Sequence, residues 1–147
     1  EVFYGDHSLE NIDLSNFNTS SVTSMEGMFY ECSKLRYLDL KDFNVSKVNN
    51  INHMFFGMNN LDILDISNFN LQQITNLNSI LEGLTNLKAL YVENFEAPNA
   101  TDTSRMFKDC SSLVAVNMIK FDTPKSISGN SISFKLLHLK KAYSPTK

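Results

Sequence analysis

An unbroken repeat of 26 residues is the feature that most constrains how this chain folds. A leucine marks the start of each repeat, and a phenylalanine follows eight places later. The leucines are Leu9, Leu35, Leu61, Leu87 and Leu113, and the phenylalanines are Phe17, Phe43, Phe69, Phe95 and Phe121. A fixed period in this range predicts an array of stacked structural units. We number positions within the repeat from the leucine, so that Leu9 and its equivalents stand at position 1.

The first third of each repeat has the pattern of a short strand. In "LENIDL" the apolar residues are Leu9, Ile12 and Leu14, and Asp13 separates the last two. Alternation of apolar and polar residues is typical of a strand with one buried face. The segment that follows, "SNFNTSS", is rich in turn-forming residues. We therefore expect one strand per repeat, ended by a turn.

The second half of each repeat has the spacing of an amphipathic helix. Val22, Met25, Met28, Phe29 and Cys32 are separated by 3, 3, 1 and 3 residues, and later repeats carry apolar equivalents. Such a stripe predicts a short helix with one buried face. Pro98 stands just before the corresponding segment of the fourth repeat.

One strand and one short helix cannot bury both apolar faces alone, whereas stacked neighbours can. We therefore expect an α/β repeat solenoid, with one parallel strand and one short helix per 26-residue repeat and the phenylalanines of position 9 stacked between the two layers. Residues 1–8 align with the end of a repeat and form a partial N-terminal repeat. Residues 9–122 form the solenoid. Residues 123–147 form a shortened last rung and a C-terminal cap or tail.

The charge is divided unevenly along the chain. Residues 1–119 hold 15 acidic and 7 basic side chains, whereas residues 120–147 hold 1 acidic and 6 basic ones. The overall net charge of −3 argues against a general nucleic-acid-binding protein. No apolar run approaches the roughly 18 residues needed to cross a bilayer. The basic end either contacts an acidic partner or is a solvated cap.

The two cysteines, Cys32 and Cys110, stand at the same repeat position three repeats apart. With one strand per repeat at about 4.8 Å, they lie roughly 14 Å from each other. A disulfide requires Cα atoms within about 7 Å. We therefore predict two free, buried thiols.

Motifs of the common enzyme classes are absent from the sequence. It contains no glycine-rich phosphate loop, GxSxG, HExxH or CxxC motif. His7, His53 and His138 fall at different repeat positions, so the fold does not predict a cluster of them. The sequence thus gives no candidate catalytic, cofactor-binding or metal-binding residue, and we expect a protein that is not an enzyme.

The outward-facing strand positions provide the best candidate for a binding site. Tyr37, Ile63 and Tyr91 place aromatic and apolar side chains on this face, next to Asp39 and Asp65. Exposed apolar patches often mark partner sites, and tyrosine is favoured at such sites. The alternative is that sequence drift between repeats has left scattered apolar residues on this face. The neighbouring carboxylates of Asp13, Asp39 and Asp65 would raise one another's pKa or attract a cation, unless water screens them.

Three segments fit the acceptor pattern for N-glycosylation. They begin at Asn18, Asn44 and Asn99. Chance matches are expected in a chain this rich in Asn, Ser and Thr. The segments matter only if the protein is secreted by a eukaryote.

The pattern "LxxLxLxxF" resembles the leucine-rich repeat "LxxLxLxxN". More specifically, "IDLSNFNTSSVTSMEGMFYECSKL" resembles the roughly 25-residue repeat of BspA-like bacterial surface proteins and mycoplasma surface lipoproteins. The matching residues are Leu14, Ser15, Phe17, Thr19, Val22, Met25, Met28, Phe29 and Cys32. The resemblance extends over about residues 2–122.

This resemblance implies a microbial protein that is secreted or held at the cell surface. Its concave sheet face would bind proteins of a host or of neighbouring cells, with Tyr37, Asp39, Ile63, Asp65 and Tyr91 as contact residues. Alternatives are a structural spacer of a surface protein and an intracellular interaction or effector module. Self-association through an exposed end rung is a further possibility.

Overall fold

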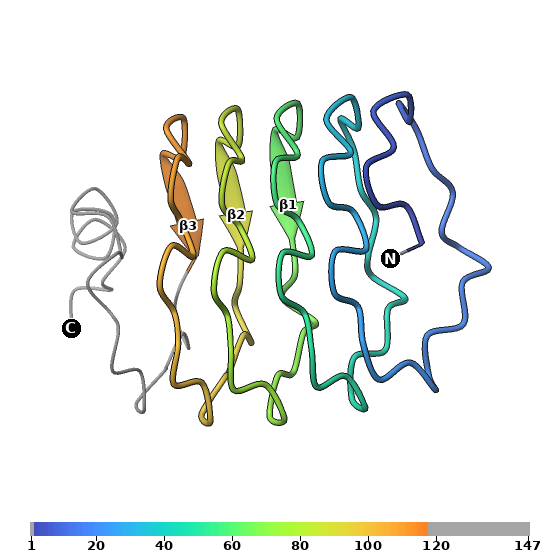
Figure 1. Ribbon diagram of the computed structural model, residues 1–147, viewed down its shortest axis with the longest axis vertical. Helices are drawn as coiled ribbons and strands as arrows, with labels where there is room; N and C mark the ends of the chain where they lie inside the picture. Colours follow the sequence, from blue (N-terminus) through green and yellow to red (C-terminus); the bar gives the residue numbers. More distant parts are fainter. Residues whose placement is uncertain (1, 118–147) are drawn as a thin grey trace.

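The structure is a computed structural model, and it describes residues 2–117. Successive repeats form coils that lie side by side in a row (Figure 1). The three strands are β1 (Ile63–Asp65), β2 (Ala89–Tyr91) and β3 (Ala115–Asn117). They form one parallel sheet in the order β1-β2-β3, with Ile63 opposite Ala89 and Ala89 opposite Ala115. Each strand pairs with its equivalent one repeat later, so the 26-residue period sets the register.

The strands are shorter than the apolar pattern, but the pattern correctly indicates which side chains face inward. Leu64 and Leu90 are buried at the centres of β1 and β2, whereas Ile63 and Tyr91 are exposed. The equivalent residues of the second coil, Leu38 and Leu40, are buried without a strand being formed. Alternation therefore continues along the stack beyond the regular strands.

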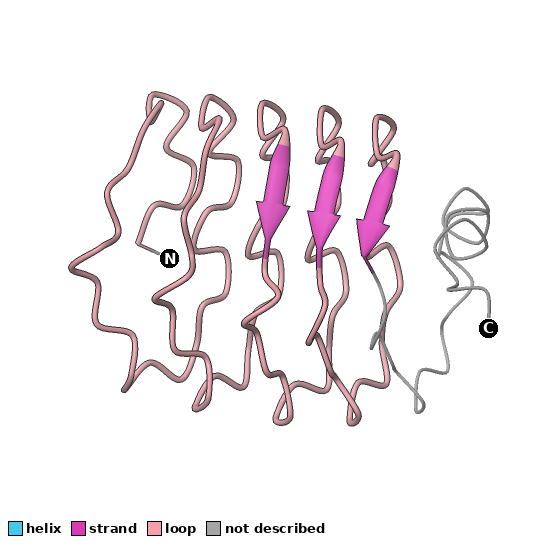
Figure 2. Cartoon of the chain, turned by 180° about the vertical axis from the view of Figure 1, so that it is seen from behind, coloured by secondary structure: helices cyan, strands magenta, loops and turns pink. Residues whose placement is uncertain are grey.

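The expected short helices do not form in the described residues 2–117, where the second half of each repeat consists of successive turns (Figure 2). The amide of Met28 donates to the carbonyl of Met25, and the amide of Tyr30 donates to that of Gly27, at 3.2 and 3.1 Å. These bonds join residues three apart, whereas an α-helix joins residues four apart. The helical expectation for this segment was wrong, although its apolar side chains are buried.

Two columns of left-handed residues explain why the helix is interrupted. Repeat positions 19 and 23 have positive φ in every described repeat. Position 19 holds Gly27, His53, Ser79 and Arg105, with φ of 55–57°, and position 23 holds Gly5, Glu31, Gly57, Gly83 and Asp109, with φ of 52–80°. A right-handed helix cannot continue through a left-handed residue. Alternate backbone amides of this segment, those of Gly27, Phe29 and Glu31, bond instead to the next coil.

This second set of bonds runs along the whole turn side. The amides of Gly27, Phe29 and Glu31 donate to the carbonyls of Asn52, Met54 and Phe56 in the next coil, at 3.0, 3.0 and 2.7 Å. An α-helix with its side chains is about 10–12 Å wide, whereas hydrogen-bonded strands lie about 4.8 Å apart. Because the coils are joined by direct backbone bonds on the turn side, and on the strand side from β1 to β3, neither side is spread apart by helices. The coils lie side by side in a row (Figures 1 and 2), and their spacing does not require a concave sheet face.

Buried side chains of all the coils form one continuous core. Phe43, Phe69 and Phe95 are buried as expected, but Phe17 is 38% exposed. Two columns of stacked rings lie on the turn side. Phe3, Phe29 and Phe55 form one, with centroids 5.6 and 6.1 Å apart, and Tyr4, Tyr30 and Phe56 form the other, with centroids 4.5 and 4.9 Å apart. Phe121, the shortened last rung and the tail lie outside the described residues.

Candidate functional site

A groove on the strand side contains all five predicted contact residues. It has a volume of about 610 Å³ and crosses three successive coils. Its lining includes Tyr37 and Asp39 from one coil, Ile63 and Asp65 from the next, and Tyr91 from the third. Five residues separated by up to 54 places in the sequence thus lie around one hollow, because the repeat brings equivalent positions side by side.

The large side chains at the groove are exposed. Tyr37 is 68% exposed, Ile63 54% and Tyr91 45%. Ile63 lies opposite Ala89, and Asp65 lies opposite Tyr91. The small side chain of Ala89 leaves Ile63 uncovered on that side. Because the two tyrosines are on coils separated by one other coil, their backbones lie roughly 10 Å apart across the stack. Tyr37, Ile63 and Tyr91 form a diagonal apolar strip, because the first two stand at repeat position 3 and Tyr91 stands at position 5, opposite Asp65.

The three aspartates of this face make local turn contacts. One carboxylate oxygen of Asp13, Asp39 and Asp65 accepts a hydrogen bond from the backbone amide two residues later, at 2.9, 3.1 and 3.0 Å. The amides belong to Ser15, Lys41 and Ser67, respectively. This contact ends the strand segment with a side-chain turn. It accounts for the aspartate at this position without a bound ligand.

These hydrogen bonds change the expected pKa directions. The backbone hydrogen bond from Ser15 lowers the pKa of Asp13, and that from Lys41 lowers the pKa of Asp39. Mutual repulsion therefore does not raise the pKa values of Asp13 and Asp39, in line with the alternative of screening by water, because each carboxylate accepts local bonds and is open to solvent. Within residues 2–117, no group of three or more His, Cys, Asp or Glu side chains is arranged to hold a metal ion.

Asp39 and Asp65 differ in their charge environment. The Nζ atom of Lys41 lies 3.0 Å from Asp39 Oδ2. Asp65 instead accepts bonds from the amide and hydroxyl of Ser67, which bring no charge. Asp39 therefore has a cationic partner on the surface, whereas the hydrogen-bonding partner of Asp65, Ser67, is uncharged.

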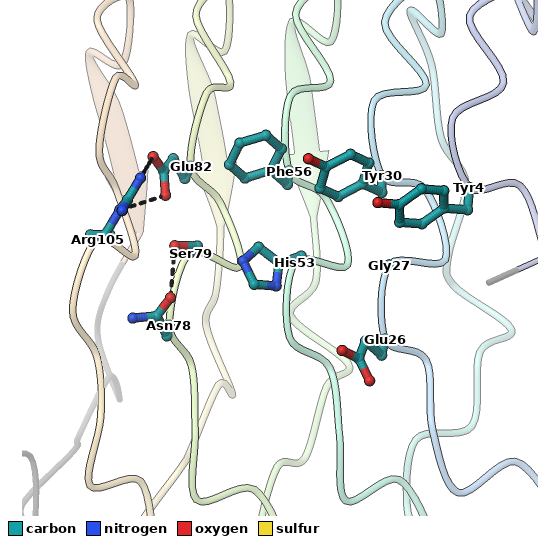
Figure 3. A pocket seen from close by; sticks show the side chains of 10 residues that line it. All are labelled: Tyr4, Glu26, Gly27, Tyr30, His53, Phe56, Asn78, Ser79, Glu82 and Arg105. Carbon is teal, nitrogen blue, oxygen red and sulfur yellow. Dashed lines mark hydrogen bonds and ion pairs between the residues drawn. The ribbon is translucent and has the colours of Figure 1, made fainter.

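A second hollow of about 470 Å³ lies on the turn side (Figure 3). Its walls include the rings of Tyr4, Tyr30 and Phe56 and the ring of His53. His53 lies edge-on to Tyr30 and Phe56, with centroids 6.3 and 5.8 Å away. The stacked rings cover one another's faces, so this hollow presents mainly ring edges to solvent. His53 stands at repeat position 19, where the other described repeats hold Gly27, Ser79 and Arg105.

Glu82 at the end of the same hollow is a buried charge with two cationic partners. Its Oε1 atom lies 2.5 Å from Arg105 Nη2 and 2.8 Å from Lys108 Nζ, and its side chain is only 4% exposed. Burial opposes its ionisation, but hydrogen bonds from Arg105, Lys108 and Ser79 outweigh burial and lower the pKa to about 2. Figure 3 shows the carboxylate turned away from the ring column towards Arg105.

Sequence reasoning missed this ion-pair cluster, although a signal was present. Repeat position 22 holds Tyr4, Tyr30, Phe56, Glu82 and Lys108 in succession. The change from three rings to an acidic and then a basic residue places Glu82 beside Lys108 on the next coil. Arg105 completes the cluster from position 19.

Cys32 and Cys110 are free and buried, as predicted. Each thiol donates to a carbonyl of the preceding coil, Cys32 to Phe3 at 3.1 Å and Cys110 to Leu81 at 3.0 Å. Burial raises the pKa of Cys32 to about 11 and that of Cys110 to about 12. Thiols of this kind are poor nucleophiles, because the thiolate is the reactive form.

The three N-glycosylation patterns fall on turns. Asn18 and Asn44 accept bonds from the backbone and hydroxyl of Ser20 and Ser46, and Asn99 donates to the carbonyl of Gln72 on the preceding coil. Turn formation and bonding between coils therefore account for these asparagines.

The fold defines a repeat protein of stacked coils, held together by backbone bonds on both sides of a continuous core. Two overlapping segments, residues 1–63 and 50–135, match the model of a family described as Mycoplasma protein of unknown function, DUF285. The chain belongs to this family. No curated protein and no solved structure matches it. Residues 2–117 contain no helix long and apolar enough to cross a membrane.

Proposed function

We propose that this chain is a non-catalytic protein-binding module of a microbial cell-surface protein. The observation that supports the proposal most directly is the gathering of Tyr37, Ile63 and Tyr91 around one groove of the strand side. In the described residues only seven large apolar side chains are exposed, and three of them lie here. Exposed apolar groups that lie together, with polar groups at the margin, are typical of protein-binding sites.

The architecture supports binding through a preformed surface. Backbone bonds join successive coils along the turn side, and on the strand side they join β1 to β2 and β2 to β3. A surface held in this way loses little conformational entropy when a partner docks, so more of the contact energy contributes to affinity. The proposed ligand is a protein of a host or of a neighbouring cell.

A relationship to BspA-like, leucine-rich-repeat proteins is also part of the proposal. Family membership is compatible with a mycoplasma surface repeat protein. The repeat pattern, with leucines at positions 1 and 6 of the first coil and inward-facing strand residues, supports placing the chain among BspA-like, leucine-rich-repeat proteins. A leucine-rich-repeat-like solenoid remains our proposal for the complete array.

A binding screen tests the proposed function. The chain and its Tyr37→Ala, Ile63→Ser, Tyr91→Ala triple variant are assayed against immobilised extracellular-matrix proteins, after circular dichroism and urea titration show that both fold. A matched control, Val2→Ser with Val114→Ser, removes exposed apolar side chains that do not line the groove. We expect saturable binding by the chain and the control, and at least a tenfold loss in the triple variant, since central aromatic contacts often contribute about 2 kcal/mol each.

One alternative has its own structural support. A row of coils joined by backbone bonds along the turn side is also a suitable rigid spacer for another domain (Figure 1). Equal binding by the triple variant would contradict the groove as the binding site. If neither protein binds to any member of the panel, the spacer becomes the better explanation.

A further inference from the structure

We infer that the strand-side groove takes an extended, basic segment of a partner protein, with one lysine or arginine side chain lying between Tyr37 and Tyr91 and its charge directed at Asp65. This inference rests on the proposed protein-binding function and specifies the chemistry of the ligand. Three observations carry it: the charge of the strand face, the free charge of Asp65 and the placement of the two tyrosines.

The strand face of the described coils is acidic. Its outward positions in and beside the strands carry four carboxylates and one ammonium group, namely Asp13, Asp39, Asp65, Glu93 and Lys41. Lys41 pairs with Asp39. A face with this excess of negative charge attracts basic partners and repels acidic ones.

Asp65 is the charge within the groove that a basic partner can reach. One of its oxygens accepts from Ser67, and it has no cationic neighbour among the residues of the groove other than Lys41, which already pairs with Asp39. Its side chain is exposed beside Ile63 and opposite Tyr91. The carboxylate therefore stands next to the apolar strip.

The tyrosines and Ile63 suit the stem of a long basic side chain. The aliphatic part of lysine or arginine packs on apolar surface while its charge stays at the polar margin. Cations are also attracted to the faces of aromatic rings. A segment in extended conformation presents every second side chain to one surface. Such a segment could place one basic side chain over Ile63 and keep its backbone along the strand face.

Three fluorescein-labelled decapeptides test this inference: alternating Lys-Thr, alternating Glu-Thr and alternating Gln-Thr. Binding is measured by fluorescence anisotropy at low and at physiological salt. We expect the Lys-Thr peptide to bind at low salt and to weaken as salt is added, because screening acts on exposed charges. The Glu-Thr and Gln-Thr peptides are expected to bind at least about tenfold more weakly.

Two variants that change the net charge equally show which carboxylate the Lys-Thr peptide requires. Asp65→Asn keeps the oxygen that accepts from Ser67 but removes the charge in the groove. Asp62→Asn removes an exposed carboxylate that pairs with Lys88 and does not line the groove. We expect Asp65→Asn and Tyr37→Ala each to weaken binding of the Lys-Thr peptide about fivefold, and Asp62→Asn to change it less than about twofold.

Several outcomes would overturn the inference. Equal binding of the three peptides, or equal loss in Asp65→Asn and Asp62→Asn, would show that Asp65 confers no selectivity. Dimerisation of the chain in sedimentation experiments, abolished by Tyr37→Ala, would assign the groove to a second copy. If a protein from the screen binds in a Tyr37-dependent manner but is unaffected by Asp65→Asn and salt, the proposed function stands and the basic segment is excluded.

Discussion

The carboxylate of Glu82 lies 2.5 Å from the guanidinium of Arg105 on the next coil, and it is almost fully buried beside a column of aromatic rings. Lys108 reaches the same oxygen at 2.8 Å. The stacked rings of Tyr4, Tyr30 and Phe56 thus give way to an ionic contact where position 22 changes from aromatic to charged. Both arrangements join neighbouring coils at the same place on the turn side.

Removal of this charge is expected to weaken the stack. We predict that Glu82→Gln lowers the free energy of unfolding by about 2 kcal/mol, since hydrogen bonds to charged groups contribute roughly 1.5–3 kcal/mol. Urea titration measures the change. Asp62→Asn is the control, because its pair with Lys88 is exposed on both sides and should contribute less than about 1 kcal/mol. Equal effects of the two variants would contradict a special role for the buried pair.

The same carboxylate makes stability depend on pH. The pKa of Glu82 falls from its ordinary value of 4.5 to about 2 in the folded chain. A lowered pKa stabilises the fold fully above pH 4.5, and this contribution is lost as the pH falls towards 2. We therefore expect the difference in unfolding free energy between the chain and Glu82→Gln to shrink from pH 5 downward. A difference that stays constant to pH 2.5 would rule out this linkage.

Alanine variants at two glycines distinguish the free-energy cost of a left-handed backbone from the free-energy cost of steric crowding. Both have left-handed backbones, with φ of +69° at Gly5 and +80° at Gly83. A Cβ added at Gly5 meets nothing within 4 Å, whereas one at Gly83 would lie 3.3 Å from the backbone of Gly57. We expect Gly5→Ala to cost about 1 kcal/mol and Gly83→Ala about 2 kcal/mol or more, measured by urea titration. The reverse order would show that the coils separate easily at this point.

The ring column inside the core is expected to be sensitive to truncation. Phe55 is fully buried and stacks on Phe29. Phe55→Ala should destabilise the fold by about 3–5 kcal/mol, because it leaves a cavity between two coils. Leucine occupies the equivalent position on the next coil, at Leu81. Phe55→Leu should therefore destabilise the fold clearly less than Phe55→Ala, as measured by thermal unfolding. Equal decreases in melting temperature for the two variants would argue against a cavity effect.

The buried thiols should react only when the coils open. Burial raises their pKa values to about 11 for Cys32 and about 12 for Cys110. At pH 8 we expect slow reaction with a thiol reagent in buffer and rapid reaction of two thiols in 6 M guanidinium chloride. Labelling of a Cys32→Ala variant shows which of the two thiols reacts at which rate. Rapid labelling of the native chain would show frequent local opening.

Much of the candidate site could be predicted by aligning the repeats. Tyr37, Ile63 and Tyr91 occupy outward strand positions, and parallel pairing in register brings them to one face. The turn contacts of Asp39 and Asp65 were not predicted, since the sequence allows a carboxylate either to repel its neighbours or to accept a local backbone bond. The observed bonds, and the pairing of Asp39 with Lys41, decide between these two outcomes.

The sequence by itself determined the period, the inward positions of each coil and the burial of both cysteines, because each follows from the recurrence of apolar residues. It did not determine the backbone of the second half of the repeat. Val22, Met25 and Phe29 have a helical spacing, yet stacked turns bury the same side. Only the tertiary structure decided between them, because the amides of Gly27 and Ser79 find carbonyls on the next coil rather than within their own. That choice depends on a neighbouring coil about 5 Å away, which no single repeat can specify.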